Sequence, residues 1–152
     1  MGERLHRGRV AAGGEHPRIP ALIDTGNNFE FSLQHRHLRD WAGIDPAALR
    51  SLGTIGIDGQ PVDRHEAMVW LYRNVPGTCA VAVGMPPFRL RMERGIAVYA
   101  RDAEPPGPRL PLLGLPSLTN NDLDWWLDPE RRNITVQTRT WRRRLMRLLC
   151  RL

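Results

Sequence analysis

Short apolar runs broken by glycine and proline dominate the first third of the chain, and they favour strands over helices. Residues 4–10 and 18–23 read as two strands joined through a tight turn at Gly13 and Gly14. Residues 28–33 alternate between polar and apolar side chains, and this period of two is typical of a half-buried strand. The N-terminal part of the protein is therefore predicted to be β.

The middle of the chain continues with short elements. Asp58-Gly59 lies between β-forming residues and predicts a hairpin over residues 53–62, whose glycines favour a mobile tip. Residues 45–49 predict a short helix, with an aspartate as its cap and a proline at its first position. Residues 67–72 and 88–100 are apolar enough to form further strands. The pattern thus predicts a series of short strands around one well-marked hairpin.

The C-terminal third contains a second apolar run and the best helical pattern of the chain. The run ends around a glycine, in Leu112-Leu113-Gly114. Residues 118–127 predict a helix, because two leucines and a tryptophan share one face and Asp-Pro follows as a stop signal. On that helix we expect one ring of the Trp125-Trp126 pair in the core and the other half exposed. Residues 133–137 predict a closing strand.

Size and composition indicate one soluble domain. The chain has 152 residues, 41% of them hydrophobic and 25% charged, which is enough for a real core. No apolar run approaches the roughly 20 residues that span a bilayer. Residues 1–14 contain no apolar signal-peptide core, so we expect a cytoplasmic protein. Cys79 and Cys150 lie far apart and are expected to remain reduced thiols.

The net charge of +6 is concentrated at the C-terminal end. All 22 basic residues are arginines, and the six that follow Thr138 meet no acid there, so the rest of the chain has 16 arginines against 16 acids. The apolar residues among them follow helical spacing and predict a basic amphipathic helix over residues 139–152. The arginines of this tail are Arg139, Arg142, Arg143, Arg144, Arg147 and Arg151, and its apolar face consists of Trp141, Leu145, Leu148, Leu149 and Leu152.

Three roles are open for this tail. A basic amphipathic helix can dock on its own body, a dimer mate or a partner protein, lie on an anionic membrane surface, or bind nucleic acid. We favour docking over membrane binding, which would place the protein peripherally at a membrane. Nucleic acid is the least favoured partner, because such binding would be salt-sensitive and blind to sequence.

The most informative motif is Asp24-Thr25-Gly26, which follows the apolar run of residues 21–23. An aspartate that leaves a buried strand where the chain turns is accessible to water and substrate. The glycine tolerates the backbone angles of the turn, and the threonine hydroxyl can tie the turn down. This arrangement is expected of a catalytic carboxylate. The alternative, for the aspartate taken alone, is an ordinary turn-forming residue.

Other candidate chemistry is weak. His35 and His37 are spaced to share one face of a strand, but no convincing third ligand accompanies them, so we expect a solvated or hydrogen-bonded pair and no metal. Ser32 and Ser117 lack the glycine elbow of a serine nucleophile. The remaining acids are expected on the solvated surface.

Taken in order, these parts resemble the retropepsin-like aspartic proteases, the single-domain relatives of retroviral protease. The resemblance covers roughly residues 4–138 and depends on Asp24-Thr25-Gly26 behind an apolar run, a glycine-bearing hairpin placed like the flap, and Leu112-Leu113-Gly114 before a short helix. It implies a mainly β, closed barrel-like acid-protease domain over residues 1–138, with one short helix near its C-terminal end. The basic helix of residues 139–152 would follow this domain.

The resemblance also implies a mechanism. Peptide hydrolysis without a metal or a nucleophilic side chain needs both a base and an acid, and two neighbouring carboxyl groups that share one proton supply both. One such aspartate per chain implies a homodimeric endopeptidase in which two Asp24 carboxylates activate a water molecule. Thr25 would brace the pair, Gly26 would permit close approach, and Ile57, Asp58 and Gly59 would close as a flap over an extended polypeptide. No cofactor or metal is implied.

Two residues depart from the family pattern. Asn27 follows the triplet where relatives usually have alanine or serine, and Leu115 follows Gly114 where many have a polar or charged residue. These departures motivate an alternative function, a catalytically weak or inactive dimer of the same fold that binds peptides or a partner protein.

Overall fold

The computed structural model describes most of the chain, which divides into two compact units, residues 1–117 and residues 118–152. Strands predominate in the described part, so the protein is mainly β. Among the described residues the strands form sheets of four, six and two strands. The described residues are 6–10, 14–73, 75, 78, 80, 82–100, 103, 106–128, 130 and 133–138.

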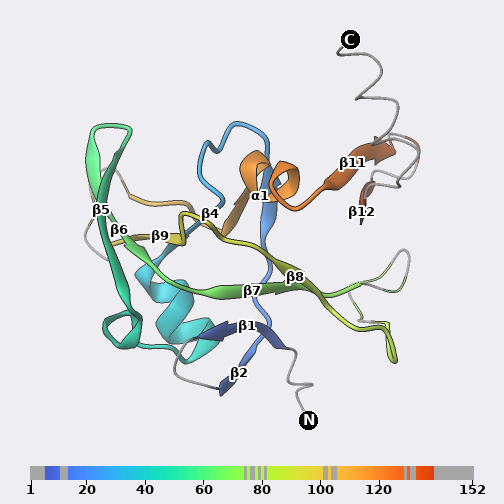
Figure 1. The fold of residues 1–152 in the computed structure, drawn as a ribbon, viewed down its shortest axis with the longest axis horizontal. Coiled ribbons are helices and arrows are strands. Elements are labelled where there is room, and N and C mark those ends of the chain that lie inside the picture. The colour runs from blue at the N-terminus through green and yellow to red at the C-terminus, as the bar shows by residue number, and fades with distance from the viewer. Residues whose placement is uncertain are drawn as a thin grey trace. The chain divides into compact units, whose positions relative to one another are not determined.

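The four-stranded sheet contains the N-terminal hairpin of the first unit (Figure 1). The strand predicted over residues 4–10 is confirmed for its described residues, 6–10, but its hairpin partner is residues 14–17 and not 18–23. Proline has no N–H to donate to a ladder, and the prolines at 17 and 20 interrupt the second run. The strands, in spatial order and all antiparallel, are β2 (Gly14–Pro17), β1 (His6–Val10), β7 (Met68–Leu71) and β8 (Phe88–Leu90).

The six-stranded sheet places a late strand between two early ones. β10 lies between β3 and β4, although β3 and β4 are consecutive in the chain. It pairs in parallel with β3 and antiparallel with β4. The order is β3 (Leu22–Asp24), β10 (Leu112–Gly114), β4 (Phe31–Gln34), β9 (Ile96–Tyr99), β6 (Gln60–His65) and β5 (Ser51–Ile57).

This sheet is open. Its two edge strands, β3 and β5, are not paired with each other in the described part of the chain. The prediction of a closed barrel-like domain is therefore wrong for the residues that the structure describes. A barrel needs its first and last strands to share a ladder, and here four strands separate the two edges.

The hairpin predicted over residues 53–62 is confirmed as β5 and β6. Ile57 and Gln60 face each other across the turn residues Asp58 and Gly59, whose φ angles are 50° and 81°. A two-residue hairpin turn with two positive φ angles favours this residue pair. β6 also pairs with β9, so the hairpin is fixed to the sheet through one of its strands.

Two helical segments connect β4 to this hairpin, namely η1 (His37–Trp41) and η2 (Pro46–Ala48). The short helix predicted over residues 45–49 is confirmed as η2. Its cap is Asp45, whose carboxylate accepts a hydrogen bond from Ala47 N at 3.0 Å.

β4 is more buried than its alternating pattern predicts. Phe31, Ser32 and Leu33 are all buried, and Glu30 just before them is 0% exposed. β4 is an interior strand with β10 on one side and β9 on the other, so polar positions are enclosed together with apolar ones. The half-buried interpretation of residues 28–33 is wrong here.

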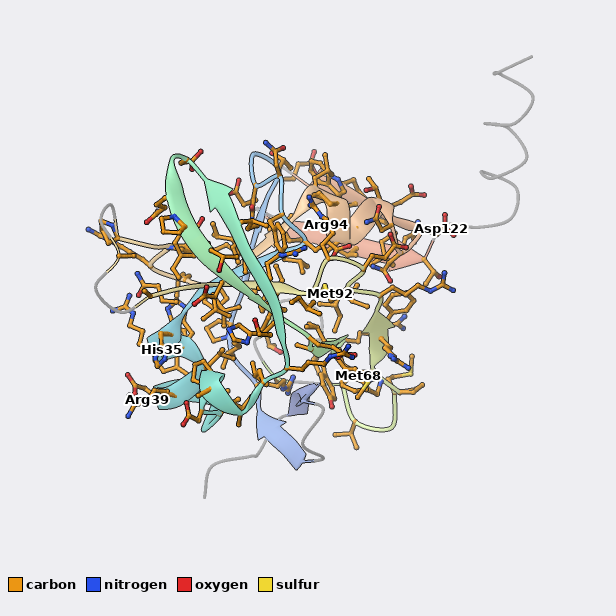
Figure 2. The ribbon with its side chains drawn as sticks, turned by 60° about the vertical axis from the view of Figure 1, so that its left-hand side comes forward. His35, Arg39, Met68, Met92, Arg94 and Asp122 are labelled. Carbon is orange, nitrogen blue, oxygen red and sulfur yellow. The ribbon has the colours of Figure 1, made fainter. Side chains whose placement is uncertain are left out.

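The helix predicted over residues 118–127 is also wrong. α1 (Leu115–Thr119) ends earlier, and β11 (Leu123–Asp128) pairs antiparallel with β12 (Asn133–Thr138). Asp122, labelled in Figure 2, has a φ of 54° that a helix cannot continue through.

The tryptophans of β11 therefore lie on a strand. Trp125 and Trp126 pair with Val136 and Thr135, as suits the preference of aromatic residues for strands. They are 38% and 40% exposed, so neither is the core ring that was expected. The closing strand predicted over residues 133–137 is confirmed as β12.

Some predictions fall on residues outside the described part of the chain. These are the basic helix of residues 139–152 and the two cysteines, Cys79 and Cys150. The boundary between a domain of residues 1–138 and a tail stays a prediction. Within the described part, no helix has the length and apolar character needed to cross a bilayer.

Candidate active site

Asp24 is the last residue of β3, at the edge of the six-stranded sheet. It is half-buried, whereas Thr25 and Gly26 are exposed. Leu22 is 52% exposed, because β3 has a strand partner on one side only within the described residues. The run before the triplet is thus an edge strand rather than the buried strand expected from its apolar sequence. Water can reach the carboxylate at this position.

The turn itself orients the Asp24 carboxylate. Gly26 N donates a hydrogen bond to Asp24 Oδ1 at 2.9 Å, and Asn27 N donates to the Asp24 carbonyl oxygen at 3.3 Å. In the described part of the chain, neither Asp24 Oδ2 nor the Thr25 hydroxyl makes a hydrogen bond. The tie expected from Thr25 is therefore made by the Gly26 amide. One carboxylate oxygen is held by the backbone, and the other is available to a substrate, a water or a second carboxyl group.

The Asn27 side chain makes hydrogen bonds within the loop that connects β3 to β4. Its Oδ1 accepts a hydrogen bond from Phe29 N at 3.0 Å, and its Nδ2 donates to Ser32 Oγ at 3.1 Å. Side chains of asparagine commonly stabilise turns by such bonds to the backbone two residues on. The amide is therefore engaged with the loop and with β4, and it makes no hydrogen bond to the Asp24 carboxylate.

Gly114 lies beneath this loop. It is the Cα partner of Asp24 in the parallel pairing of β10 with β3, and its N–H donates to the Glu30 carbonyl oxygen at 3.0 Å. A Cβ at Gly114 would lie 1.9 Å from the Phe29 carbonyl oxygen and 2.6 Å from that of Asn27. Only glycine fits this close backbone approach. The two motifs singled out in the sequence are thus in direct contact.

Glu30 is a residue that sequence reasoning missed. Its Oε1 accepts a hydrogen bond from Glu93 N at 3.2 Å and its Oε2 accepts one from Arg94 N at 2.9 Å. The prediction that the remaining acids are solvated is therefore wrong for this residue. The only signal in the sequence was an acid between two phenylalanines, since the partners lie on a distant turn.

The Arg94 side chain also contacts the loop that connects β3 to β4. Its guanidinium donates a hydrogen bond to the Asn28 carbonyl oxygen and lies 4.6 Å from the centroid of the Phe29 ring. Figure 2 labels Arg94 and Met92, which belong to the connection between β8 and β9. This contact between a cation and an aromatic face adds to the hydrogen bond.

The candidate flap residues lie on the hairpin tip. Asp58 and Gly59 are exposed, whereas Ile57 packs with Ile55 against the buried cluster of Phe29, Val62, Ala97 and Tyr99. In both views the tip and the β3–β4 loop lie on the same side of the first unit (Figures 1 and 2). Burial raises the pKa of the Tyr99 hydroxyl, and the negative charge of Asp58 adds to this effect.

The structure does not bring Asp24 and the flap residues into contact within one chain. The sheet order places β10, β4 and β9 between β3 and the hairpin. It is Phe29, five residues after Asp24, that reaches the side chains of the hairpin.

The two candidate histidines are not a ligand pair. They lie on the helical segment around η1, where residues two apart do not share a face. His37 is buried, and its Nδ1 accepts a hydrogen bond from Gln34 N at 3.1 Å while its Nε2 lies 3.0 Å from the Arg109 carbonyl oxygen. Only a neutral ring with its proton on Nε2 satisfies both bonds. The described residues contain no cluster of three or more His, Cys, Asp or Glu placed to bind a metal.

The pKa of His37 is lowered from its ordinary value of 6.5, chiefly because burial disfavours the charged ring. The bond to the Arg109 carbonyl and the charge of Asp40 oppose this shift, and the charge of Arg36 adds to it. The ring thus acts as a neutral clip between η1 and the segment that leads into β10.

Comparisons of the chain with protein-family models, with curated proteins and with solved structures found no match.

Proposed function

We propose that this protein is an aspartic endopeptidase of retropepsin type, which acts as a homodimer and cleaves an extended polypeptide. The main support is the arrangement around Asp24: an accessible carboxylate, held by the Gly26 amide, on a loop packed over Gly114. A half-buried carboxylate at a strand end, oriented by a backbone hydrogen bond, has the geometry that general acid–base chemistry needs.

The dimer supplies the second carboxyl group. Asp24 lies on an edge strand with exposed Leu22 and Thr25, so a second copy can approach it across a two-fold axis. Two adjacent carboxyl groups share one proton and titrate as a unit. The ionised group takes a proton from water, and the water oxygen attacks the peptide carbonyl carbon. The protonated group assists by donating to the carbonyl oxygen, and the C–N bond then breaks with protonation of the leaving nitrogen.

The β5–β6 hairpin would act as the flap. Its tip, Ile57 to Gly59, would close over the bound peptide, exclude water and add backbone hydrogen bonds. In this proposal residues 1–138 form the protease domain, and residues 139–152 serve for docking on a partner or on an anionic membrane surface.

Peptide cleavage is the decisive test. The purified protein is incubated with a mixture of peptides between about pH 4 and 7, the range where paired carboxyl groups act. We expect cleavage that Asp24→Asn reduces by about 10²- to 10⁴-fold or more. Asp40→Asn, which changes an exposed acid on η1, is the matched control and should remain active. Full activity of Asp24→Asn would refute the proposal.

The peptide-binding alternative is distinguished by the same experiment. A folded protein that binds peptides across this pH range and hydrolyses none would favour it. One of the two departures that motivated this alternative, Asn27, now carries less weight. Its side chain makes hydrogen bonds to Phe29 N and Ser32 and none to the Asp24 carboxylate.

A further inference from the structure

Residues 28–30 and the turn at residues 93–94 are joined by side chains from both segments. The Glu30 carboxylate accepts hydrogen bonds from two consecutive backbone N–H groups of the turn, Glu93 and Arg94. The Arg94 guanidinium in turn donates a hydrogen bond to the Asn28 carbonyl oxygen and lies over the face of the Phe29 ring. A carboxylate that is fully buried is normally paired or hydrogen-bonded, and the partners of Glu30 include the backbone N–H groups of the turn that carries Arg94.

Phe29 links this contact to the candidate flap. Its ring is covered by the Arg94 guanidinium and belongs to the buried cluster against which Ile55 and Ile57 of β5 pack. Its carbonyl oxygen lies against Gly114 of β10. Movement of Phe29 would therefore change the packing of both the loop that begins at Asp24 and the β5–β6 hairpin.

We infer that Glu30 and Arg94 form a clasp that positions the Asp24 loop and couples it, through Phe29, to the β5–β6 hairpin. Neither residue is a catalytic residue; both act through the loop. The coupling follows from the contacts described here, whereas its effect on peptide cleavage rests on the proposed function.

Hydrogen exchange measures the coupling without any assumption about activity. Amide exchange of segments 24–31 and 51–65 is followed by mass spectrometry in the full-length protein and in variants at position 94. Arg94→Met keeps a long unbranched side chain but removes the charge and the donor. We expect exchange in both segments to accelerate by about tenfold, since a charge-assisted hydrogen bond and a cation–π contact are lost.

Two further arginine variants serve as controls. Arg94→Lys keeps a cation and a donor and should restore most of the protection. Arg89→Met removes an exposed arginine on the neighbouring strand β8 and should leave both segments unchanged. Glu30→Gln tests the other half of the clasp, because an amide has only one oxygen for the two N–H groups; we expect the same two segments to be affected.

The possible results separate the clasp from the proposed protease activity. Unchanged exchange in Arg94→Met would overturn the clasp, and acceleration in the loop alone would overturn the coupling to the hairpin. If the protein cleaves peptides, Arg94→Met should lower kcat about tenfold with little change in KM, and lysine should rescue it. If it cleaves none, the proposed function fails, and the exchange data still decide whether the clasp exists.

Discussion

Gly114 lies directly opposite Asp24 in the parallel pairing of β10 with β3, and the loop that begins at Asp24 folds over it. The N–H of Gly114 donates to the Glu30 carbonyl oxygen, and the carbonyl oxygens of Asn27 and Phe29 occupy the space where a side chain would start. The motifs Asp24-Thr25-Gly26 and Leu112-Leu113-Gly114, which are far apart in the sequence, thus form one structural element. A change at either one should affect the other.

Gly114→Ala is expected to destabilise the fold by about 1–3 kcal/mol or more, because the added methyl group would overlap the Phe29 carbonyl oxygen and backbone atoms cannot easily yield. Urea unfolding followed by circular dichroism measures this. Gly56→Ala is the matched control, since nothing lies within 4 Å of a Cβ there. Equal stability of the two variants would contradict the close approach.

Asn27→Ala is expected to lower stability by about 1–2 kcal/mol, because Phe29 N then loses its partly buried acceptor. Members of the proposed family usually have alanine or serine after the triplet, so the sequence alone would predict a gain in cleavage. We expect no gain, because the loop loses its internal closure. Asn28→Ala, at an exposed neighbouring position, is the control for both thermal unfolding and peptide cleavage.

Local signals in the sequence were sufficient where the backbone requirement is local. Asp58 and Gly59 meet the need of a two-residue turn for positive φ angles, and Asp45 caps η2 with its own carboxylate. In the same way Asp24-Thr25-Gly26 marked the turn after β3, although the Gly26 amide, and not the expected Thr25 hydroxyl, orients the Asp24 carboxylate.

Features that depend on distant partners could not be read from the sequence. Glu30 is buried because the turn at 93–94 supplies two N–H groups, and nothing near Glu30 indicates that turn. The spacing of residues 118–127 suits a helix. Asp122 has a left-handed backbone conformation, however, and the residues after it form β11, which pairs with β12. The closed barrel failed for a similar reason, since closure depends on a ladder between β3 and β5 that local pattern cannot specify.

Thr25→Val tests the proposed dimer. Thr25 is exposed and its hydroxyl makes no hydrogen bond in the described part of the chain, so the isosteric change should leave the fold of one subunit intact. If the two Thr25 hydroxyls brace the pair, their loss should weaken dimerisation by about tenfold, the effect of one or two hydrogen bonds. Sedimentation over a concentration series measures the dissociation constant, and circular dichroism confirms the fold. An unchanged constant would exclude Thr25 from the interface.

His37 should make stability depend on pH in a defined direction. Its pKa is lowered in the folded protein from the ordinary 6.5, chiefly by burial, so the unfolded chain takes up the proton first as the pH falls. The stabilisation is complete above pH 6.5 and declines as the pH drops from there toward the lowered pKa. Protonation would also place an N–H on Nδ1 against the N–H of Gln34.

Thermal unfolding of wild type and His37→Gln at several pH values between about 8 and 5 isolates this effect, because glutamine does not titrate in the range. We expect the wild type to be the more stable protein at high pH, since the ring bonds to Gln34 and to the Arg109 carbonyl. That advantage should shrink below pH 6.5, with no change above it. A difference that stays constant with pH would mean that the ring is protonated equally in the folded and unfolded states, and the neutral clip between η1 and the segment before β10 would have to be abandoned.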